Sequence, residues 1–223
     1  MKRCFLFFVM SFFTVSLWSQ KLPSTLKMKD GTIMTGIVRM PKKIDDKIIA
    51  FTPKGGKATK VQSADIDVMT IMYANGTTEE YEYIPVFTIR SSYEGTYDKI
   101  SGYAWFLVEI RDYVTLYHAW TPSESHYDAG SNSFTTTQLA TTYKYCRRDG
   151  EKAATLISNA SGSIGNNKFF KKCAGNYFSD DQTIIEKINN GVYTYKNIPE
   201  MVKEYNSRNA HKNLVPIQNK ENK

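Results

Sequence analysis

The sequence predicts a mainly β protein of the α+β class, in which small barrel-like or rolled antiparallel sheets are followed by a C-terminal helical segment. Three observations support this prediction. Asp-Gly and Asn-Gly pairs stand between short β-prone runs, a pattern typical of tight hairpin turns. Tyr and Phe contribute 15 and 12 of the 223 residues, and aromatic side chains favour strands. Helix start and stop signals occur only after residue 158.

Residues 1–20 have the pattern of a cleavable secretory signal peptide. Lys2 and Arg3 begin the segment, an almost unbroken apolar run follows as far as Trp18, and polar residues then end it. The run is shorter than the ~20 apolar residues that a membrane-spanning helix needs. We therefore expect cleavage near Gln20 and a mature protein in the periplasm or outside the cell, with no transmembrane segment.

Cleavage would lower the net charge from +7 to +5, because it removes two basic residues and no acidic residue. The remaining basic residues are dispersed along the chain rather than clustered. A mild positive charge favours anionic surfaces and glycans as partners. No nucleic-acid partner is expected, because export separates the protein from the usual target.

The first β section spans residues 21–90 and is predicted to form a small barrel-like unit. An Asp-Gly pair at 30–31 and an Asn-Gly pair at 75–76 each join two β-prone runs, and both residues of such turns need a positive φ. Pro85 is expected to close the section. The predicted strands are 25–29, 32–38, 47–52, 57–62, 67–73 and 77–83.

The second β section spans residues 91–158. A continuous apolar run at 103–110 indicates a strand that is buried on both faces. Residues 121–138 are small and polar, so they are predicted to form a long loop, and a loop of this length in a compact domain is typically mobile or functional. The other predicted strands are 113–118, 139–147 and 152–157.

The helical segment spans residues 159–209. A short helix is predicted at 168–174. The run Ser-Asp-Asp-Gln is a capping box that places Ser179 at the N-cap of a second helix, and a third helix begins after Asn197. Helices this short are not stable alone, so we expect them to pack on the sheet or on each other. The polar residues 210–223 are expected to form a flexible tail.

Four fragments carry a resemblance to other proteins: LKMKDGTIMTGIV, VTLYHAW, TYKYCRRDGEKAATLI and NYFSDDQTIIEKINNGVYTYKNIPEMVKEYN. With the N-terminal signal pattern, this layout resembles uncharacterised exported proteins that are common in Bacteroidota, in which a β-rich body ends in a helical tail. The resemblance covers most of the mature chain. It implies export and this architecture, and it implies no active site, because the shared motifs are structural.

Cys146 and Cys173 are the cysteines that remain once the signal segment is removed. An oxidising compartment favours a disulfide between them. The bridge would close a loop of 28 residues and contribute roughly 3–4 kcal/mol in the chain-entropy model. We expect the bridge, and the alternative is two buried thiols.

The sequence contains no recognised catalytic motif, phosphate loop or dinucleotide fingerprint, so no catalytic residue, cofactor or metal is expected. His118, His126 and Asp128 could ligate a zinc ion with one open position, although their spacing matches no metal motif. These three residues define the alternative function, an envelope-polymer hydrolase with or without a metal. The acidic pairs at 45–46, 79–80 and 180–181 have structural explanations in turns, strands and helix starts.

Tyrosines crowd the β sections, and a Tyr side chain offers an apolar ring with a polar tip, which suits sugars or peptides. We place the expected ligand site where the long loop leaves the sheet, at Tyr117, His118, Trp120, His126 and Tyr127. The sequence thus predicts a non-enzymatic exported binding or scaffold protein of the bacterial cell envelope. Its expected partner is a glycan or an envelope protein.

Overall fold

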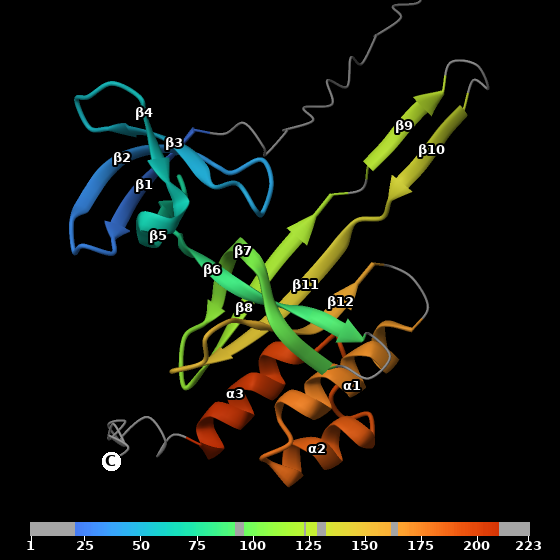
Figure 1. Ribbon diagram of the computed structural model, residues 1–223. Coiled ribbons are helices and arrows are strands. Elements are labelled where there is room, and N and C mark those ends of the chain that lie inside the picture. The colour runs from blue at the N-terminus through green and yellow to red at the C-terminus, as the bar shows by residue number, and fades with distance from the viewer. Residues whose placement is uncertain (1–20, 92–95, 123, 129–132, 162–164, 210–223) are drawn as a thin grey trace, which may run out of the picture.

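Figure 1 shows the computed structural model, which describes the backbone of residues 21–91, 96–122, 124–128, 133–161 and 165–209. Side chains are described for these residues except 88–99 and 123–138. The strands are β1 (Lys21–Met28), β2 (Ile33–Arg39), β3 (Ile48–Pro53), β4 (Thr59–Gln62), β5 (Ile66–Met72), β6 (Thr78–Ser91), β7 (Thr96–Ile110), β8 (Val114–Thr121), β9 (Glu124–Asp128), β10 (Ser133–Gln138), β11 (Thr141–Arg148) and β12 (Thr155–Ala160). The helices are α1 (Asn166–Tyr177), α2 (Gln182–Asn189) and α3 (Ile198–Arg208), and a 3-10 turn, η2 (Ser63–Asp65), precedes β5.

Within the described residues, ten strands form one antiparallel sheet in the order β12-β11-β8-β7-β6-β5-β1-β2-β3-β4, and β9 pairs with β10 separately. The predicted class, mainly β with a helical C-terminal segment, is confirmed, and the sheet is rolled rather than closed. The predicted hairpin turns are also confirmed. Gly31, Gly76 and Gly150 have φ values of +87°, +82° and +83° at the β1–β2, β5–β6 and β11–β12 turns.

The N-terminal half of the sheet consists of β1 to β5, with β1 paired to both β2 and β5. Alternate side chains of these strands point to the inner face of the roll and form one apolar core. The buried members of this core are Leu26, Val38, Ile49, Phe51, Ile66, Met69, Ile71, Tyr83 and Trp105. The last two belong to β6 and β7, so the core extends to the junction with the other half.

Strands β6 and β7 form a long hairpin that connects the two halves (Figure 1). Pro85 was expected to end the strand, but β6 continues past it to Ser91. The Pro85 carbonyl accepts a hydrogen bond from Ala154 N at 2.8 Å, and Phe87 N donates to Ala154 O at 3.1 Å. A proline lacks only the donor, so its carbonyl and the next residues can still pair.

The C-terminal half has two apolar faces. Strands β6 and β7 cross over β8, β11 and β12 (Figure 1), and the space between them is filled by Ile84, Ala104, Phe106, Tyr117, Ala119 and Ala154. Ala104, Trp105 and Phe106 are consecutive buried residues, as predicted for a strand covered on both sides. The opposite face of β8, β11 and β12 packs against the helices, through Val114, Leu116, Cys146, Ile157 and apolar residues of α1 to α3.

The third helix begins after Asn197, as predicted, whereas the other two differ from the predicted helices at their ends. α1 is longer than the predicted 168–174 and runs from Asn166 to Tyr177. The N-cap of α2 is Asp181 rather than Ser179, because the Asp181 Oδ1 accepts from Thr183 N at 3.1 Å and Ile184 N at 3.2 Å. Since the run contains two aspartates, sequence spacing alone did not identify which polar residue caps the helix.

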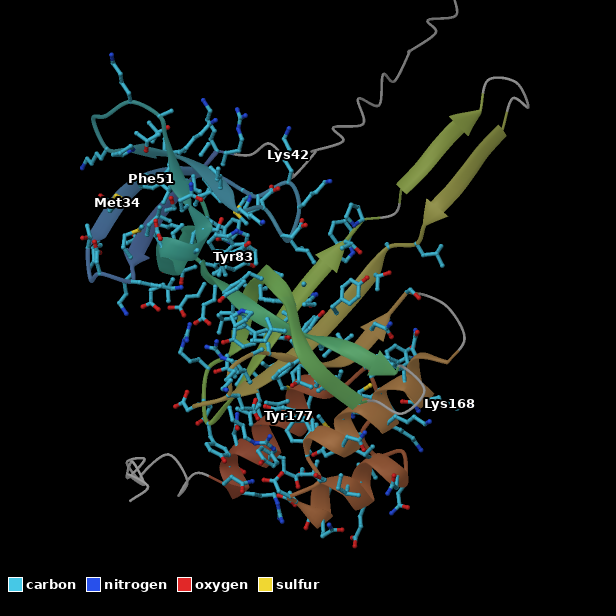
Figure 2. The ribbon with its side chains drawn as sticks, in the orientation of Figure 1. Met34, Lys42, Phe51, Tyr83, Lys168 and Tyr177 are labelled. Atoms are coloured by element: carbon cyan, nitrogen blue, oxygen red, sulfur yellow. The ribbon has the colours of Figure 1, made fainter. Side chains whose placement is uncertain are left out.

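Arg148 at the end of β11 links the helices to the sheet through hydrogen bonds of its guanidinium group. Its Nη2 donates to Tyr177 O at 2.9 Å, to Asp180 Oδ1 at 3.0 Å and to the Tyr205 hydroxyl at 3.0 Å. The guanidinium also lies 4.3 Å from the centroid of the Tyr177 ring, and Tyr177 lies between the sheet and the helices in Figure 2. Three of the four fragments quoted above supply buried residues to this region, in structural rather than catalytic roles.

No disulfide joins Cys146 and Cys173, both of which are described and buried, so the structure differs from the expected bridge. Cys146 belongs to the core between the sheet and the helices, and Cys173 is buried on α1. Burial raises the pKa of the Cys146 thiol well above its usual value. Burial therefore accounts for both residues, in agreement with the alternative of two buried thiols.

The predicted loop at 121–138 contains a β-hairpin, formed by β9 and β10, so that prediction was wrong. The register pairs Asp128 with Ser133 and His126 with Thr135. The hairpin continues from β8 and β11 and projects away from the body (Figure 1). A projecting hairpin has no core to face, so its strands do not need the apolar alternation that marks a strand in a sequence.

Among the described residues, none of the helices combines the length and the apolar character that crossing a membrane requires. The expected signal peptide at 1–20 and the expected tail at 210–223 lie outside the described residues.

Candidate functional site

A cavity of about 320 Å³ lies where the two halves of the sheet meet. We call it the waist cavity. Its volume falls in the range of small-molecule sites, roughly 300–1,000 Å³. The walls come from both halves and are formed by Leu22, Met40, Pro41, Lys43, Ile44, Tyr73, Tyr81, Trp105, Leu107, His118, Ala119 and Trp120.

The connection between β2 and β3 forms one wall and is fixed to β7. Trp105 N donates to Ile44 O at 2.6 Å, and Trp105 Nε1 donates to Asp46 O and Ser63 Oγ, each at 3.2 Å. The Asp46 carboxylate accepts from the backbone N–H groups of Lys42 at 2.7 Å and Lys43 at 3.1 Å. These bonds hold residues 40–47 over β7, so the wall is formed without a ligand.

Two tyrosine rings contribute to the opposite wall, and their hydroxyl groups are already engaged. Tyr73 and Tyr81 both donate to Glu79 Oε2, at 2.5 Å and 2.7 Å. Burial raises the pKa of both phenols, and the hydrogen bond to Glu79 raises it further. The tyrosines therefore remain neutral and offer mainly their rings to the cavity.

His118 lines the cavity from β8. Its Nε2 atom is buried and has no hydrogen-bond partner within the described part of the chain. Burial lowers the pKa of His118, and the charge of Lys144, which lies opposite on β11, lowers it further, while Glu109 and Glu79 act in the opposite direction. His118 is thus a neutral ring at neutral pH.

Trp120 and Lys43 stand at the exposed part of the wall. Trp120 is 45% exposed, and Lys43 is exposed on the β2–β3 connection. Among the described residues that line the cavity, Lys43 is the only Lys, Arg, Asp or Glu. The neighbouring Lys42 extends outward from the same connection (Figure 2).

The structure brings together two of the five residues predicted as a ligand site, His118 and Trp120. Tyr117 directly precedes His118, and successive side chains of a strand point to opposite faces. It is fully buried, and its hydroxyl donates to Glu82 Oε2 at 2.7 Å. Glu82 in turn accepts from Arg111 at 2.7 Å. Tyr117 is therefore part of a buried polar network and does not line the cavity.

His126 and Tyr127 lie in β9, and their side chains are outside the described ones, as is that of Asp128. The eight residues from His118 to His126 span up to about 26 Å in an extended chain, and β9 lies beyond the end of β8 in Figure 1. The backbone therefore does not bring His126 to the waist cavity. Where side chains are described, the structure has no group of three His, Cys, Asp or Glu residues suited to a metal.

Sequence analysis missed most of the cavity wall. Leu22, Met40 and Tyr73 come from separate elements of the N-terminal half, and no local pattern connects them with β8. The usable signal was the apolar run at 103–110, because a strand buried on both faces supplies residues to two cores and to the junction between them.

No family model, no curated protein and no solved structure matches this chain.

Proposed function

We propose that this chain is an exported, non-enzymatic binding protein of the bacterial cell envelope, and that it holds its ligand in the waist cavity. The observation that carries the proposal is the preformed cavity of about 320 Å³ at the junction of the two halves. Mainly apolar, concave sites with few polar groups are typical of small-ligand binding. The export and the envelope location rest on the signal pattern at 1–20.

The side chains of the cavity support binding rather than catalysis. General acid–base chemistry needs a titratable group positioned beside the reacting atoms, and covalent chemistry needs a nucleophile beside a base. The cavity offers His118, whose Nε2 atom is shielded from solvent, and two tyrosine hydroxyls that Glu79 already engages. The zinc form of the hydrolase alternative needs His118 beside His126 and Asp128, and these residues lie on different strands, β8 and β9.

The tryptophans provide a reporter for the proposed site. Of the three tryptophans in the sequence, Trp105 and Trp120 line the cavity, and Trp18 lies in the segment expected to be removed. The tryptophan emission of the mature chain should therefore respond when a ligand enters. The sequence favours a glycan or an envelope protein as partner, so the probes include both classes.

The test is an emission titration of the mature chain with N-acetylglucosamine, decanoate and a leucine-rich tripeptide. We expect a saturable change with at least one probe, and a loss of its thermal stabilisation in Trp120→Ala but not in Trp120→Phe. The proposal would be overturned if no probe changes the emission. Stoichiometric zinc that is lost in the His118→Ala, His126→Ala double variant would replace it with the hydrolase alternative.

A further inference from the structure

The chemistry of the waist cavity narrows the class of ligand, an inference that rests on the proposed function. We infer that the ligand is a single-chain amphiphile, with a hydrocarbon body inside the cavity and an anionic group at Lys43. Four features of the cavity support this inference: its apolar walls, the engagement of its polar groups, its charge and its size.

The walls are mostly hydrocarbon and aromatic carbon. Aliphatic side chains come from Leu22, Met40, Pro41, Ile44, Leu107 and Ala119, and rings come from Tyr73, Tyr81, Trp105 and Trp120. Such walls gain free energy by covering apolar surface of a ligand. They provide no corresponding gain for a ligand surface that is covered with hydroxyl groups.

The polar atoms of three of these four rings already have partners in the protein. Tyr73 and Tyr81 donate to Glu79, and Trp105 Nε1 donates to Asp46 and Ser63. Each hydroxyl of a sugar loses water when it enters such a site and needs a hydrogen bond in return. The cavity interior does not supply that many partners, so a sugar ring fits it poorly.

His118 supports the same conclusion. Its Nε2 atom is shielded from solvent as well as unpartnered among the described residues, so the ring presents mainly carbon to the cavity. Its lowered pKa keeps it uncharged at neutral pH. The interior is therefore uncharged and largely apolar, as the body of an amphiphile requires.

The rim carries a positive charge. Lys43 is exposed, and the Asp46 carboxylate in the same connection accepts hydrogen bonds from the backbone N–H groups of Lys42 and Lys43. An anionic group on the ligand would meet Lys43 at the mouth while its chain lies inside. With a volume near the lower end of small-ligand sites, the cavity suits one free chain rather than the surface of a bilayer.

The experiment measures binding of decanoate and decanol to the mature chain by tryptophan emission. We compare Lys43→Gln with the matched control Lys42→Gln, which changes the neighbouring exposed lysine outside the cavity wall. We expect both probes to bind the wild type. Lys43→Gln should weaken the binding of decanoate about threefold, an effect of the size typical of an exposed ion pair. It should not weaken the binding of decanol. Lys42→Gln should leave both unchanged.

The outcomes separate this inference from the proposed function. Binding of N-acetylglucosamine without binding of decanoate would overturn the inference of an amphiphilic ligand and leave the proposed binding function in place. Equal weakening of decanoate and decanol in Lys43→Gln, or no effect on either, would overturn the anionic end. If the chain sediments with phosphatidylglycerol vesicles and decanoate does not inhibit this sedimentation, the ligand would be a membrane surface. Failure of every probe would overturn both proposals.

Discussion

Asn206 in α3 pairs its carboxamide with both backbone polar groups of Val114 at the start of β8. The Oδ1 atom accepts from Val114 N at 2.9 Å, and Nδ2 donates to Val114 O at 3.0 Å, with Asn206 almost fully buried. The pairing of β7 with β8 ends at Ile110 and Leu116, so the side chain takes the place of a neighbouring strand. α3 is thereby fixed to the strand that carries His118 and Trp120 to the waist cavity.

We predict that Asn206→Ala lowers the free energy of unfolding by about 3 kcal/mol, because two buried backbone groups lose their partner. Urea unfolding measures this change. Ser207→Ala in the same helix is the control. Its side chain is exposed, so the expected change stays within about 0.5 kcal/mol. Equal stabilities of the two variants would contradict the role given to Asn206.

Tyr117→Phe tests whether Tyr117 is structural. The variant removes the hydroxyl that donates to the buried Glu82 carboxylate, and a hydrogen bond to a charged group contributes about 2 kcal/mol. We expect that loss in stability, with probe binding in the waist cavity unchanged. A variant of unchanged stability that no longer binds would instead support the ligand role predicted from the sequence.

His118→Leu tests the neutral, buried state of His118. The folded pKa lies below the unfolded value of about 6.5, so below that pH the unfolded chain binds a proton that the folded chain resists. Stability is therefore fully present above pH 6.5 or so and falls on acidification, by at most about 1.4 kcal/mol per pH unit for one proton. We expect the wild type to lose more stability than His118→Leu between about pH 7 and pH 5. Parallel pH profiles from thermal unfolding would contradict this prediction.

The cysteines test the burial of the core. Burial raises the pKa of the Cys146 thiol, and the thiolate is the reactive form. We expect thiol reagents to react slowly with the native mature chain and to find two thiols once it is unfolded without a reductant. A non-reducing peptide map that links Cys146 to Cys173 in exported material would restore the expected disulfide.

Turn chemistry was the part of the fold that the sequence predicted best. The hairpin glycines Gly31, Gly76 and Gly150 all have positive φ values, because the conformation of a short turn is determined by the residues within it. The ends of helices and strands were harder to predict from the sequence. The α2 N-cap depended on which aspartate faced the helix, and the passage of β6 through Pro85 depended on Ala154, a residue far along the chain.

The candidate site was predicted in part, for a physical reason. His118 and Trp120 share one face of β8, and Tyr117, directly before His118, faces the other way, so strand alternation could have separated Tyr117 from these two residues. The rest of the cavity depends on long-range packing. Its wall at Ile44 is fixed because Trp105 donates hydrogen bonds to Ile44 O and Asp46 O, a relation that no spacing in the sequence contains.

The most direct test of the central claim, that the waist cavity is the binding site, compares two methionine variants. Met40 lines the cavity, whereas Met34 packs against the same N-terminal core without lining it. We measure the affinity of the probe that binds the wild type, by tryptophan emission. Met40→Phe fills the cavity and should weaken the probe about tenfold, equivalent to 1.4 kcal/mol, while Met34→Phe should leave its affinity unchanged. Equal affinities of the two variants would contradict the claim.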